Sequence, residues 1–512
     1  MLHDFLQSSA RRLGEKVAFA IGDQRATYAQ IDRASNQLAH ALRRRGVRRG
    51  DRVVVFAENA IETAVSFWGA LKANAVVSVV NPLTKAAKLR YLLDDCAATA
   101  LLADAHLWPT VTAVAPGAQS LRSVLCIGGK LDDAAVAAVP HAERFDQALA
   151  AEDGSAPPRR ECIDVDLAAI VYTSGSTGDA KGVMLTHRNM LTAAESISTY
   201  LGLREDDVIL CALPMAFDYG LYQMIMAFRM GAQVVAERSF AYPAQVLNQM
   251  MRWGVTVFPG VPTMFAMLSD MRLDSYDFSK VRAVTNTAAA LPVKHIRRSQ
   301  EIFPKARVFS MYGLTECKRC TYLPPEDLAR KPESVGIAIP NTELWLVDEQ
   351  DRKLPPGSVG QLVIRGATVM RGYWGKPEST AKKLKPGPLP GEMVLYTGDL
   401  CRLDEEGYLY FVARMDDIIK SRGEKVAPKE VEAALVDIAG VREAAVIGVP
   451  DEVLGQAVKA FVVLEAGVTL TEKDIRREAQ KRLENFMVPQ LVEIVGELPR
   501  GATGKVQKSA LR

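Results

Sequence analysis

A segment rich in glycine and hydroxyl side chains constrains the fold of this chain more than any other feature. The apolar run 167–171 predicts a β-strand, and the segment 172–183 (YTSGSTGDAKGV) follows it directly. Glycine lets backbone N–H groups approach an anion closely, hydroxyls donate further hydrogen bonds, and Lys181 supplies positive charge. Because a strand that leads into such a loop can wrap a polyphosphate, the segment predicts binding of a nucleoside triphosphate.

Two familiar phosphate-binding motifs do not describe this loop. Lys181 is followed by Gly182, whereas a G-x-x-x-x-G-K-[ST] loop needs serine or threonine there. No G-x-G-x-x-G opens a helix after a strand, so a dinucleotide-binding fold has no support. Taken alone, the segment would also fit a simple flexible turn. Whether the segment is a phosphate-binding loop or a flexible turn therefore depends on the rest of the chain.

Length and composition set broad limits on the function. A chain of 512 residues is too long for one compact core, so two or more domains are expected. Hydrophobic residues make up 48% and charged residues 24%, which is typical of a globular protein. The net charge of +3 is too small for a dedicated nucleic-acid binder. No apolar run approaches the roughly 20 residues that a membrane helix needs.

Cysteine usage and the N-terminal residues favour the cytoplasm. The seven cysteines are scattered and odd in number, which fits reduced thiols. Residues 1–5 lack the basic and apolar regions of a signal peptide. Cys317 and Cys320 have C-x-x-C spacing, but no second Cys/His pair accompanies them, and this disfavours a zinc site.

Hydrophobic patterns predict an α/β fold of mostly parallel sheets. Helices are expected over 28–45 and 61–73, and they alternate with strands at 52–56 and 76–80. Residues 129–165, rich in Ala, Asp, Pro and Gly, are interpreted as a surface excursion.

The second half of the chain changes character twice. Short strands at 344–347 and 361–364, separated by turns, predict a small antiparallel or barrel-like subdomain, and 383–391 is expected to be loop. After Arg414 the pattern is that of a separate small α+β unit. Its expected elements are a helix at 431–435, strands at 443–449 and 459–464, and a helix at 475–483.

Six further motifs follow the first loop along the chain. They are 213–220 (LPMAFDYG), 311–316 (MYGLTE), 372–374 (GYW), 396–399 (YTGD), 414–420 (RMDDIIK) and 498–505 (LPRGATGK). Together with the glycine-rich loop, they resemble the adenylate-forming superfamily in order and in spacing. That superfamily includes acyl- and aryl-CoA synthetases, firefly luciferase and the adenylation domains of nonribosomal peptide synthetases. The resemblance covers nearly the whole chain.

The resemblance implies a two-step reaction and two domains. A carboxylate attacks the α-phosphate of ATP, pyrophosphate leaves, and the acyl-adenylate is then transferred to a phosphopantetheine thiol. Such an enzyme aligns reactants and stabilises charge, and it needs no covalent nucleophile of its own. The implied domains are 1–413, which binds ATP and the acid, and 414–512, which is mobile about a hinge at Asp416.

The nucleotide-binding residues follow from the same resemblance. The loop should hold the β- and γ-phosphates, while Thr315 should bond the α-phosphate. Glu316 should bind Mg²⁺, because hard cations prefer carboxylate oxygens. Tyr312 should lie along the adenine. The loop residues concerned are Thr173, Ser174, Gly175, Ser176, Thr177, Gly178 and Lys181.

Later motifs supply the remaining catalytic groups. Asp399 should accept hydrogen bonds from the ribose hydroxyls, and Arg414 should reach the ribose or the phosphate. Lys505 should bridge the attacking carboxylate and the α-phosphate. After a rotation about Asp416, the face that bears Lys425 should approach the pantetheine of CoA or of a carrier protein.

Asp218 raises the question of which acid is activated. In amino-acid-activating members, an aspartate at the corresponding position binds the substrate ammonium, and a buried carboxylate suits that task. The alternative is that Asp218 bonds local backbone. Arg319 is unusual and could pair with a second substrate carboxylate or turn outward to solvent. The other residues that the resemblance assigns to the acyl pocket are Tyr219, Tyr222, Thr263, Val284, Asn286, Met311 and Cys320.

Three functions therefore compete. The first is an adenylating ligase that loads an amino or β-amino acid onto a carrier protein, which would be a separate chain because few residues follow Lys505. The second is an acyl- or aryl-CoA synthetase that uses free CoA. The third is a nucleotide-binding scaffold without catalysis, which the presence of Glu316, Asp399 and Lys505 disfavours.

Overall fold

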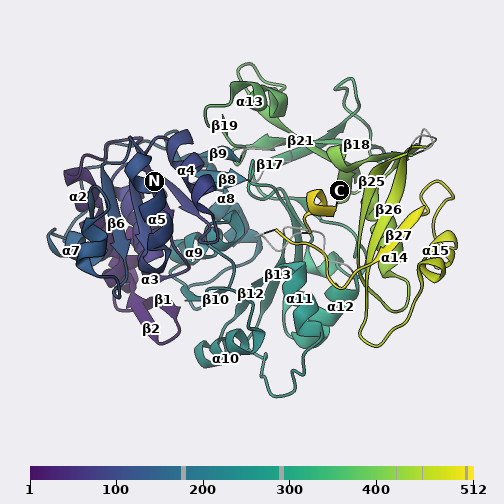
Figure 1. Cartoon of the computed structure of the whole chain (residues 1–512), viewed down its shortest axis with the longest axis horizontal. Coiled ribbons are helices and arrows are strands. Elements are labelled where there is room, and N and C mark those ends of the chain that lie inside the picture. Colours follow the sequence, from purple (N-terminus) through teal and green to yellow (C-terminus); the bar gives the residue numbers. More distant parts are fainter. Residues whose placement is uncertain (174–179, 288–292, 422–423, 452–453, 502–505, 512) are drawn as a thin grey trace. The chain divides into compact units, whose positions relative to one another are not determined.

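Two compact units make up the chain. The computed structural model describes residues 1–173, 180–287, 293–421, 424–451, 454–501 and 506–511 (Figure 1). Unit 1 comprises Met1–Leu328, Ala338–Glu343 and Arg365–Leu395, and unit 2 comprises Ala329–Ile337, Leu344–Ile364 and Tyr396–Arg512. None of the helices in the described ranges is long and apolar enough to cross a membrane. The domain boundary at 413/414 rests on the expected hinge and stays a prediction.

The first sheet of unit 1 carries the glycine-rich loop. Its eight strands lie in the order β19-β9-β8-β4-β3-β5-β6-β7, and the inner pairs are parallel. The predicted helices and strands of this region are confirmed. The strands are β3 (Arg52–Phe56), β4 (Val76–Val80), β5 (Ala98–Asp104), β6 (Ser123–Ile127), β7 (Ala142–Arg144), β8 (Leu167–Thr173), β9 (Lys181–Thr186) and β19 (Gly372–Tyr373). The helices are α2 (Tyr28–Arg44), α3 (Ile61–Lys72), α4 (Ala86–Asp95) and α5 (Trp108–Val114).

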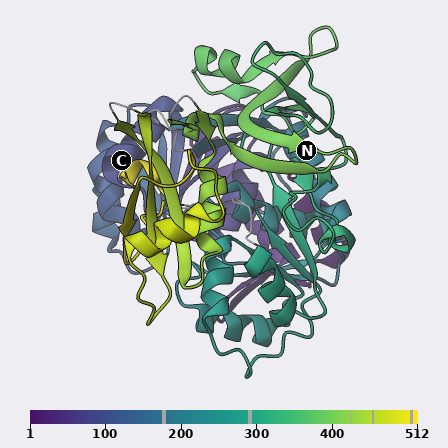
Figure 2. The ribbon, with the colours of Figure 1, turned by 90° about the vertical axis from the view of Figure 1, so that its right-hand side faces the viewer.

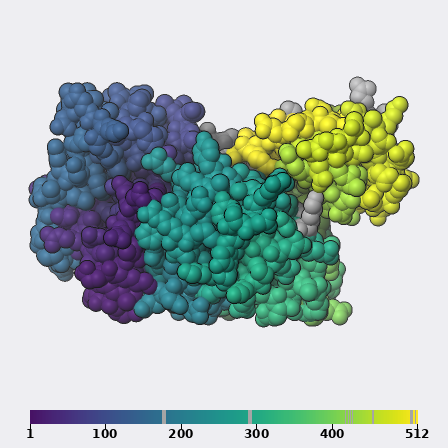
Figure 3. All heavy atoms as spheres, turned by 90° about the horizontal axis from the view of Figure 1, so that it is seen from below, coloured from purple at the N-terminus to yellow at the C-terminus, as the bar shows by residue number. Residues whose placement is uncertain are grey.

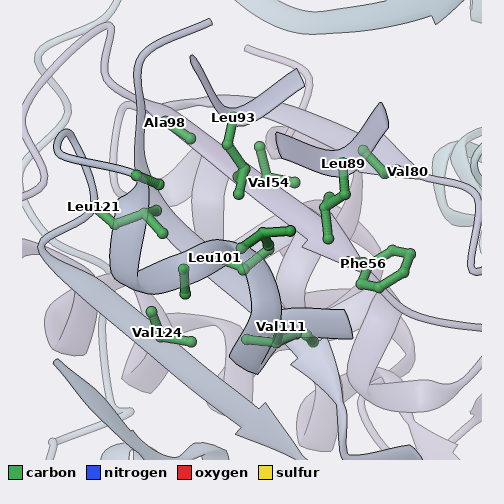
Figure 4. Packing of buried hydrophobic residues seen from close by; sticks show 14 of the residues in the cluster. Val54, Phe56, Val80, Leu89, Leu93, Ala98, Leu101, Val111, Leu121 and Val124 are labelled. Atoms are coloured by element: carbon green, nitrogen blue, oxygen red, sulfur yellow. The ribbon is translucent and has the colours of Figure 1, made fainter. Parts of the chain in front are cut away.

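A packed apolar core fixes this sheet beneath helices α4 and α5. Figure 4 shows side chains of the strands and of the two helices pointing toward one another. Each fully buried leucine or valine of this kind contributes about 1.5 to 3 kcal/mol. The labelled residues are Val54, Phe56, Val80, Leu89, Leu93, Ala98, Leu101, Val111, Leu121 and Val124. The strand that leads into the glycine-rich loop is thereby held on a rigid layer.

Residues 129–165 contain more structure than their composition predicts. Helices α6 (Asp133–Ala137) and α7 (Phe145–Ala150) flank β7, which pairs in parallel with β6. The expectation of a surface excursion is therefore wrong for this part. The segment closes one edge of the first sheet, and Phe145 and Ala148 are buried. Short elements of this kind depend on tertiary pairing, which local composition does not reveal.

The second sheet of unit 1 takes its strands from distant parts of the sequence. Its order is β16-β15-β14-β13-β12-β10-β11-β1-β2, and β1 pairs in parallel with β11. The first residues, purple in Figure 3, accordingly lie against the blue and teal surface of this unit. The strands are β1 (Val17–Ile21), β2 (Gln24–Thr27), β10 (Val208–Cys211), β11 (Gln233–Ala236), β12 (Val257–Gly260), β13 (Ala283–Asn286), β14 (Arg307–Tyr312), β15 (Thr321–Tyr322) and β16 (Ile337–Ala338). Helices of this region are α1 (Asp4–Leu13), α8 (His187–Tyr200), α9 (Asp218–Met230), α10 (Pro243–Trp253), α11 (Pro262–Ser269) and α12 (Val293–Ile302).

A five-stranded sheet follows, with the order β17-β18-β21-β20 and β22 paired to β21. Its strands are β17 (Thr342–Val347), β18 (Val359–Gly366), β20 (Leu384–Pro386), β21 (Met393–Leu403) and β22 (Leu409–Arg414). The predicted small antiparallel region is confirmed. The prediction that 383–391 is entirely loop is wrong, because helix α13 (Pro377–Lys383) ends at its first residue and β20 follows.

The C-terminal part of unit 2 is a sheet with helices on one face. The strand order is β24-β23-β26-β25, and β27 pairs with β26. The strands are β23 (Ile419–Ser421), β24 (Glu424–Val426), β25 (Val441–Asp451), β26 (Gly455–Leu464) and β27 (Leu491–Ile494). Helices α14 (Pro428–Val436) and α15 (Glu472–Gln480) share one apolar core with β25 and β26. Figure 2 shows the helices and strands of this part in yellow-green and yellow. The predicted α+β unit is confirmed.

Candidate active site

The carboxyl ends of four parallel strands bring the acyl-pocket motifs together. Strands β10, β12, β13 and β14 are neighbours and parallel, so the segments after them emerge at one edge of the sheet. Ligands of open α/β sheets bind at this edge. The motif 213–220 follows β10 and makes a tight turn into α9, where a Cβ on Gly220 would lie 2.3 Å from the carbonyl oxygen of Pro214. The sheet therefore positions Asp218 at the start of α9.

The connection between β14 and β15 carries several polar side chains of the site. Both strands pair antiparallel, with Tyr312 opposite Thr321, and residues 313–320 form the loop between them. The loop folds back tightly, since a Cβ on Gly313 would lie 2.3 Å from the carbonyl oxygen of Lys318. Lys318 has a φ of 62°, an uncommon conformation for a residue with a side chain. This fold-back brings Gly313 against the backbone of Lys318 and Arg319.

The ends of the glycine-rich loop are anchored on the first sheet. Thr173 is opposite Lys181 in the β8–β9 pair. The hydroxyl of Tyr172 donates to Asp95 Oδ2 at 2.6 Å, and that of Tyr91 donates to the carbonyl oxygen of Ala180 at 3.0 Å. The predicted phosphate-binding residues Ser174, Gly175, Ser176, Thr177 and Gly178 lie outside the described residues.

Tyr373 joins three of the motifs. Strand β19 pairs with β9, so Tyr373 stands opposite Val183. Its hydroxyl donates to Glu316 Oε1 at 2.7 Å, and Lys181 Nζ lies 5.4 Å from its ring centroid. The backbone N–H of Met370 donates to the carbonyl oxygen of Glu316 at 2.7 Å. Two residues of the predicted nucleotide site, Lys181 and Glu316, therefore meet at Tyr373 in unit 1.

The magnesium ion that the resemblance implies fits these residues. Mg²⁺ is usually held by one or two carboxylates together with substrate phosphates. Glu316 is half-buried, and one of its carboxylate oxygens is oriented by Tyr373. The described part of the chain contains no cluster of three or more ligating side chains, so phosphate oxygens would supply the other ligands. A bound Mg²⁺ would neutralise phosphate charge there.

Asp218 has a cationic partner within the protein. Lys318 Nζ lies 3.3 Å from Asp218 Oδ2 and donates to the Asp218 carbonyl oxygen at 2.6 Å. It also lies 4.0 Å from the ring centroid of Tyr222. Burial lowers the pKa of Lys318 to about 7, Asp218 opposes this shift, and Arg319 adds to it. The sequence hypothesis gave this carboxylate to a substrate ammonium, whereas the structure gives it a protein ammonium, because the loop after β14 folds back onto α9.

Arg319 is turned into the protein. It is only 1% exposed, and its guanidinium lies 5.0 Å from the ring centroid of Tyr219. The Tyr219 hydroxyl donates to the carbonyl oxygen of Thr285 at 2.9 Å, next to Val284 and Asn286 on β13. Burial raises the pKa of Tyr219 to about 12, and the nearby charge of Arg319 works against that rise. Of the two predicted orientations, the outward one is wrong.

The remaining predicted pocket residues are also placed by unit 1. Val284, Asn286 and Met311 are buried near the ends of β13 and β14, and Met311 Sδ accepts a hydrogen bond from Tyr200 at 2.9 Å. Thr263 lies half-buried in the first turn of α11.

Cys320 belongs to a pair of thiols. Its Sγ lies 2.8 Å from that of Cys317, and both residues are fully buried. All seven cysteines of the chain are free and buried. Among the described residues, no third histidine, cysteine, aspartate or glutamate joins the two thiols in a group that could hold a metal ion.

Unit 2 holds the predicted ribose-binding pair. Asp399 is opposite Arg414 in the β21–β22 pair, and Arg414 Nη1 lies 3.0 Å from Asp399 Oδ1. The Asp399 side chain is almost fully buried, whereas that of Arg414 is 44% exposed. Asp416 lies in a short 3-10 turn (Met415–Asp417), and Lys425 lies on β24. Lys505 lies outside the described residues.

Sequence reasoning missed two residues of the site. Tyr373 belongs to the motif 372–374, to which the sequence assigned no role. Lys318 follows Glu316 by two positions, where a lysine is usually solvated. Its burial depends on contact with a residue far away in the sequence.

Comparisons with known proteins identify the family of the chain. A sequence model of the AMP-binding enzyme family matches residues 6–374, and one of the AMP-binding enzyme C-terminal domain matches residues 430–505. A long-chain-fatty-acid–CoA ligase of Escherichia coli is 31% identical over 100% of this chain and 94% of its own length. Tyrocidine synthase 3 of Brevibacillus parabrevis is 30% identical over 100% of this chain, but only 8% of its own length is covered.

Solved structures show the same fold. The anthranilate CoA ligase AuaEII in complex with anthranoyl-AMP matches with a TM-score of 0.90, at 27% identity over 100% of this chain and 96% of that one. ATP-bound MatB from Rhodopseudomonas palustris matches with a TM-score of 0.88, at 29% identity over 100% of this chain and 98% of that one. With its large N-terminal and small C-terminal α/β parts, the chain belongs to the AMP-binding enzyme family and is an adenylate-forming ligase.

Proposed function

We propose that this enzyme is an AMP-forming acyl- or aryl-CoA ligase that uses ATP and free CoA. The relatives matched over nearly their whole length include long-chain-fatty-acid–CoA ligases of Escherichia coli and Bacillus subtilis. An anthranilate CoA ligase is among the structures with the same fold. These likenesses favour the second of the three functions that the sequence left open.

The ion pair between Asp218 and Lys318 is the main observation in favour of a substrate acid that lacks an amino group. The half-buried carboxylate of Asp218 is compensated by one cation, and Lys318 Nζ already lies 3.3 Å away. A substrate ammonium at the same carboxylate would place two positive charges beside it, with Arg319 close by as a third. We therefore infer that the acid carries no ammonium group at this position.

The residues of unit 1 have defined tasks in the first half-reaction. Lys181 and Thr315 would hold phosphate oxygens, and Tyr373 would keep the Glu316 carboxylate oriented for Mg²⁺ through its hydrogen bond of 2.7 Å. The acid carboxylate would attack the α-phosphate, the bond from that phosphorus to the bridging oxygen would break, and pyrophosphate would leave. Lys505 stays the predicted bridge between carboxylate and phosphate.

Loading of a separate carrier protein, the first hypothesis from the sequence, has less support. It rested on Asp218 as an ammonium ligand and on the Gly-Glu-Lys segment 423–425, and tyrocidine synthase 3 is the one peptide synthetase among the relatives described above. The location that we propose is the cytoplasm, in keeping with seven free thiols.

A thiol-acceptor assay tests this proposal. The enzyme is incubated with ATP, Mg²⁺ and a panel of fatty, aryl and amino acids, and AMP and thioester are measured with CoA or with a phosphopantetheinylated carrier protein. We expect AMP and thioester with CoA and acids that lack an amino group. Thioester formation that needs the carrier protein, or exchange of pyrophosphate confined to amino acids, would contradict the proposal.

A further inference from the structure

Arg319 is an interior cation without an interior anion among the described residues. Its side chain is only 1% exposed. Within the described part of the chain, no carboxylate forms an ion pair with it, and its Nε has no hydrogen-bond partner. An arginine is permanently charged in proteins, so it cannot escape the cost of burial by losing its proton. The charge therefore calls for a counter-ion that the described chain does not supply.

The nearby charged groups do not balance this guanidinium. Two adjacent cations, Lys318 and Arg319, share this interior, and Lys318 already engages Asp218. Arg319 interacts electrostatically with the phenols of Tyr200, Tyr219 and Tyr222, which carry no charge at neutral pH, and burial raises the pKa of each still further. The ring of Tyr219 offers a cation–π contact at 5.0 Å, worth about 0.5 to 2 kcal/mol.

The stabilisation from this cation–π contact is small compared with the free-energy cost of burying the guanidinium charge. Removing an ion from water costs several kcal/mol even after the protein relaxes, and a partner charge with good hydrogen bonds is needed to offset it. A guanidinium presents a fork of donors that fits a carboxylate in a bidentate arrangement. Since Nε of this fork is buried without a hydrogen-bond partner among the described residues, a bound anion is the fitting partner.

The position of Arg319 indicates whether its anionic partner belongs to the acid substrate or to the nucleotide. Its neighbour Tyr219 bonds Thr285 on β13, and the strand ends here are those that gather the acyl-pocket residues. The groups expected to hold phosphates, by contrast, meet around Tyr373 and Glu316.

We propose that Arg319 binds a second carboxylate of the acid substrate, so that the enzyme prefers acids with an anionic group remote from the reacting carboxylate. This inference rests on the proposed CoA ligase function and names its substrate class.

The test compares dicarboxylic acids with their own monomethyl esters. Straight-chain and aromatic dicarboxylic acids, and the matching monoesters, are supplied with ATP, Mg²⁺ and CoA, and AMP and acyl-CoA are measured. We expect kcat/KM for the preferred diacid to exceed that for its monoester by roughly 100-fold, the size of effect that a buried charge pair provides. In Arg319→Met this ratio should fall close to one. Arg352→Met is the matched control, because Arg352 is 74% exposed in unit 2, and it should keep the wild-type ratio.

The outcomes separate this inference from the function on which it rests. Suppose that the wild-type enzyme forms AMP and thioester from monocarboxylic acids, and that its kcat/KM for a diacid does not exceed that for the monoester. This result would contradict only the proposed role of Arg319. An equal loss with every acid in Arg319→Met, together with a raised KM for ATP, would assign the guanidinium to the nucleotide and also overturn the inference. No AMP from any acid with CoA would count against the CoA ligase proposal itself. The wild-type ratio needs no variant, so the test stays decisive if Arg319→Met fails to fold.

Discussion

The pairing of Asp218 with Lys318 predicts a measurable coupling between the two residues. At 3.3 Å and an effective dielectric constant of about 20, their attraction is about 5 kcal/mol before desolvation. In Lys318→Met the carboxylate, which is 24% exposed, still reaches water, so we expect a loss of about 2 to 3 kcal/mol. Asp218→Asn removes the charge that opposes the fall of the Lys318 pKa, so Lys318, which is only 2% exposed, should give up its proton near neutral pH, and the loss should not exceed that of Lys318→Met.

Thermal unfolding of the purified variants provides the assay. For a unit of more than 300 residues, a loss of 1 kcal/mol lowers Tm by about 1 to 1.5 °C, so Lys318→Met should lower it by about 3 °C. The double variant should lose about 2 to 3 kcal/mol less than the sum of the single variants. Lys481→Met is the control, because its ion pair with Glu478 is on the surface and Lys481 is 61% exposed. Its Tm should change by less than about 1 °C.

Two results would refute this reasoning. If the losses of the single variants simply add, the two charges do not interact in solution. If Asp218→Asn keeps its Tm and loses activity only with amine-bearing acids, the carboxylate serves a substrate ammonium, and the role given to Lys318 is wrong.

Three further predictions follow from other contacts. Tyr373→Phe loses the hydrogen bond to Glu316 and should lower pyrophosphate exchange at least about 10-fold; an unchanged rate at limiting Mg²⁺ would contradict this. Gly313→Ala puts a Cβ 2.3 Å from the Lys318 carbonyl oxygen, so Tm and exchange should both fall, and a wild-type Tm would show that the turn is looser. Burial lowers the pKa of His187 from 6.5 to about 4, so the unfolded chain takes up a proton over that range that the native protein does not, and stability should fall by up to about 3 kcal/mol as the pH drops. Tm measured from pH 7 to pH 4 should decline less steeply in His187→Asn; equal slopes would remove this assignment.

Local sequence patterns were sufficient for the elements that carry the site. The strand before the glycine-rich loop and the helix from Tyr28 onward are where periodicity placed them. Thr27 caps that helix, and its hydroxyl accepts a hydrogen bond from the Gln30 backbone N–H as part of a capping box. Such signals lie within a few neighbouring residues, so they can be read without knowledge of the tertiary fold.

The partners inside the site could not be predicted in the same way. Asp218 and Lys318 are 100 positions apart, and they meet only because β10 and β14 share one sheet. Lys318 has a φ of 62°, and because the residue in this conformation is not a glycine, the sequence does not indicate a turn there. The edge strand β7 was missed for a related reason, since its three residues acquire their structure by pairing with β6. Each of these features depends on long-range contacts that pattern and propensity do not encode.

The burial of all seven native thiols has a practical consequence for following this enzyme at work. Maleimide dyes need an accessible thiolate, and burial makes that form scarce, as the raised pKa of Cys96, about 11, illustrates. A single cysteine introduced at an exposed position of unit 2, such as Arg477, which is 67% exposed, should therefore take up the dye without removal of the natural ones. The two half-reactions could then be timed by fluorescence on an otherwise unaltered chain.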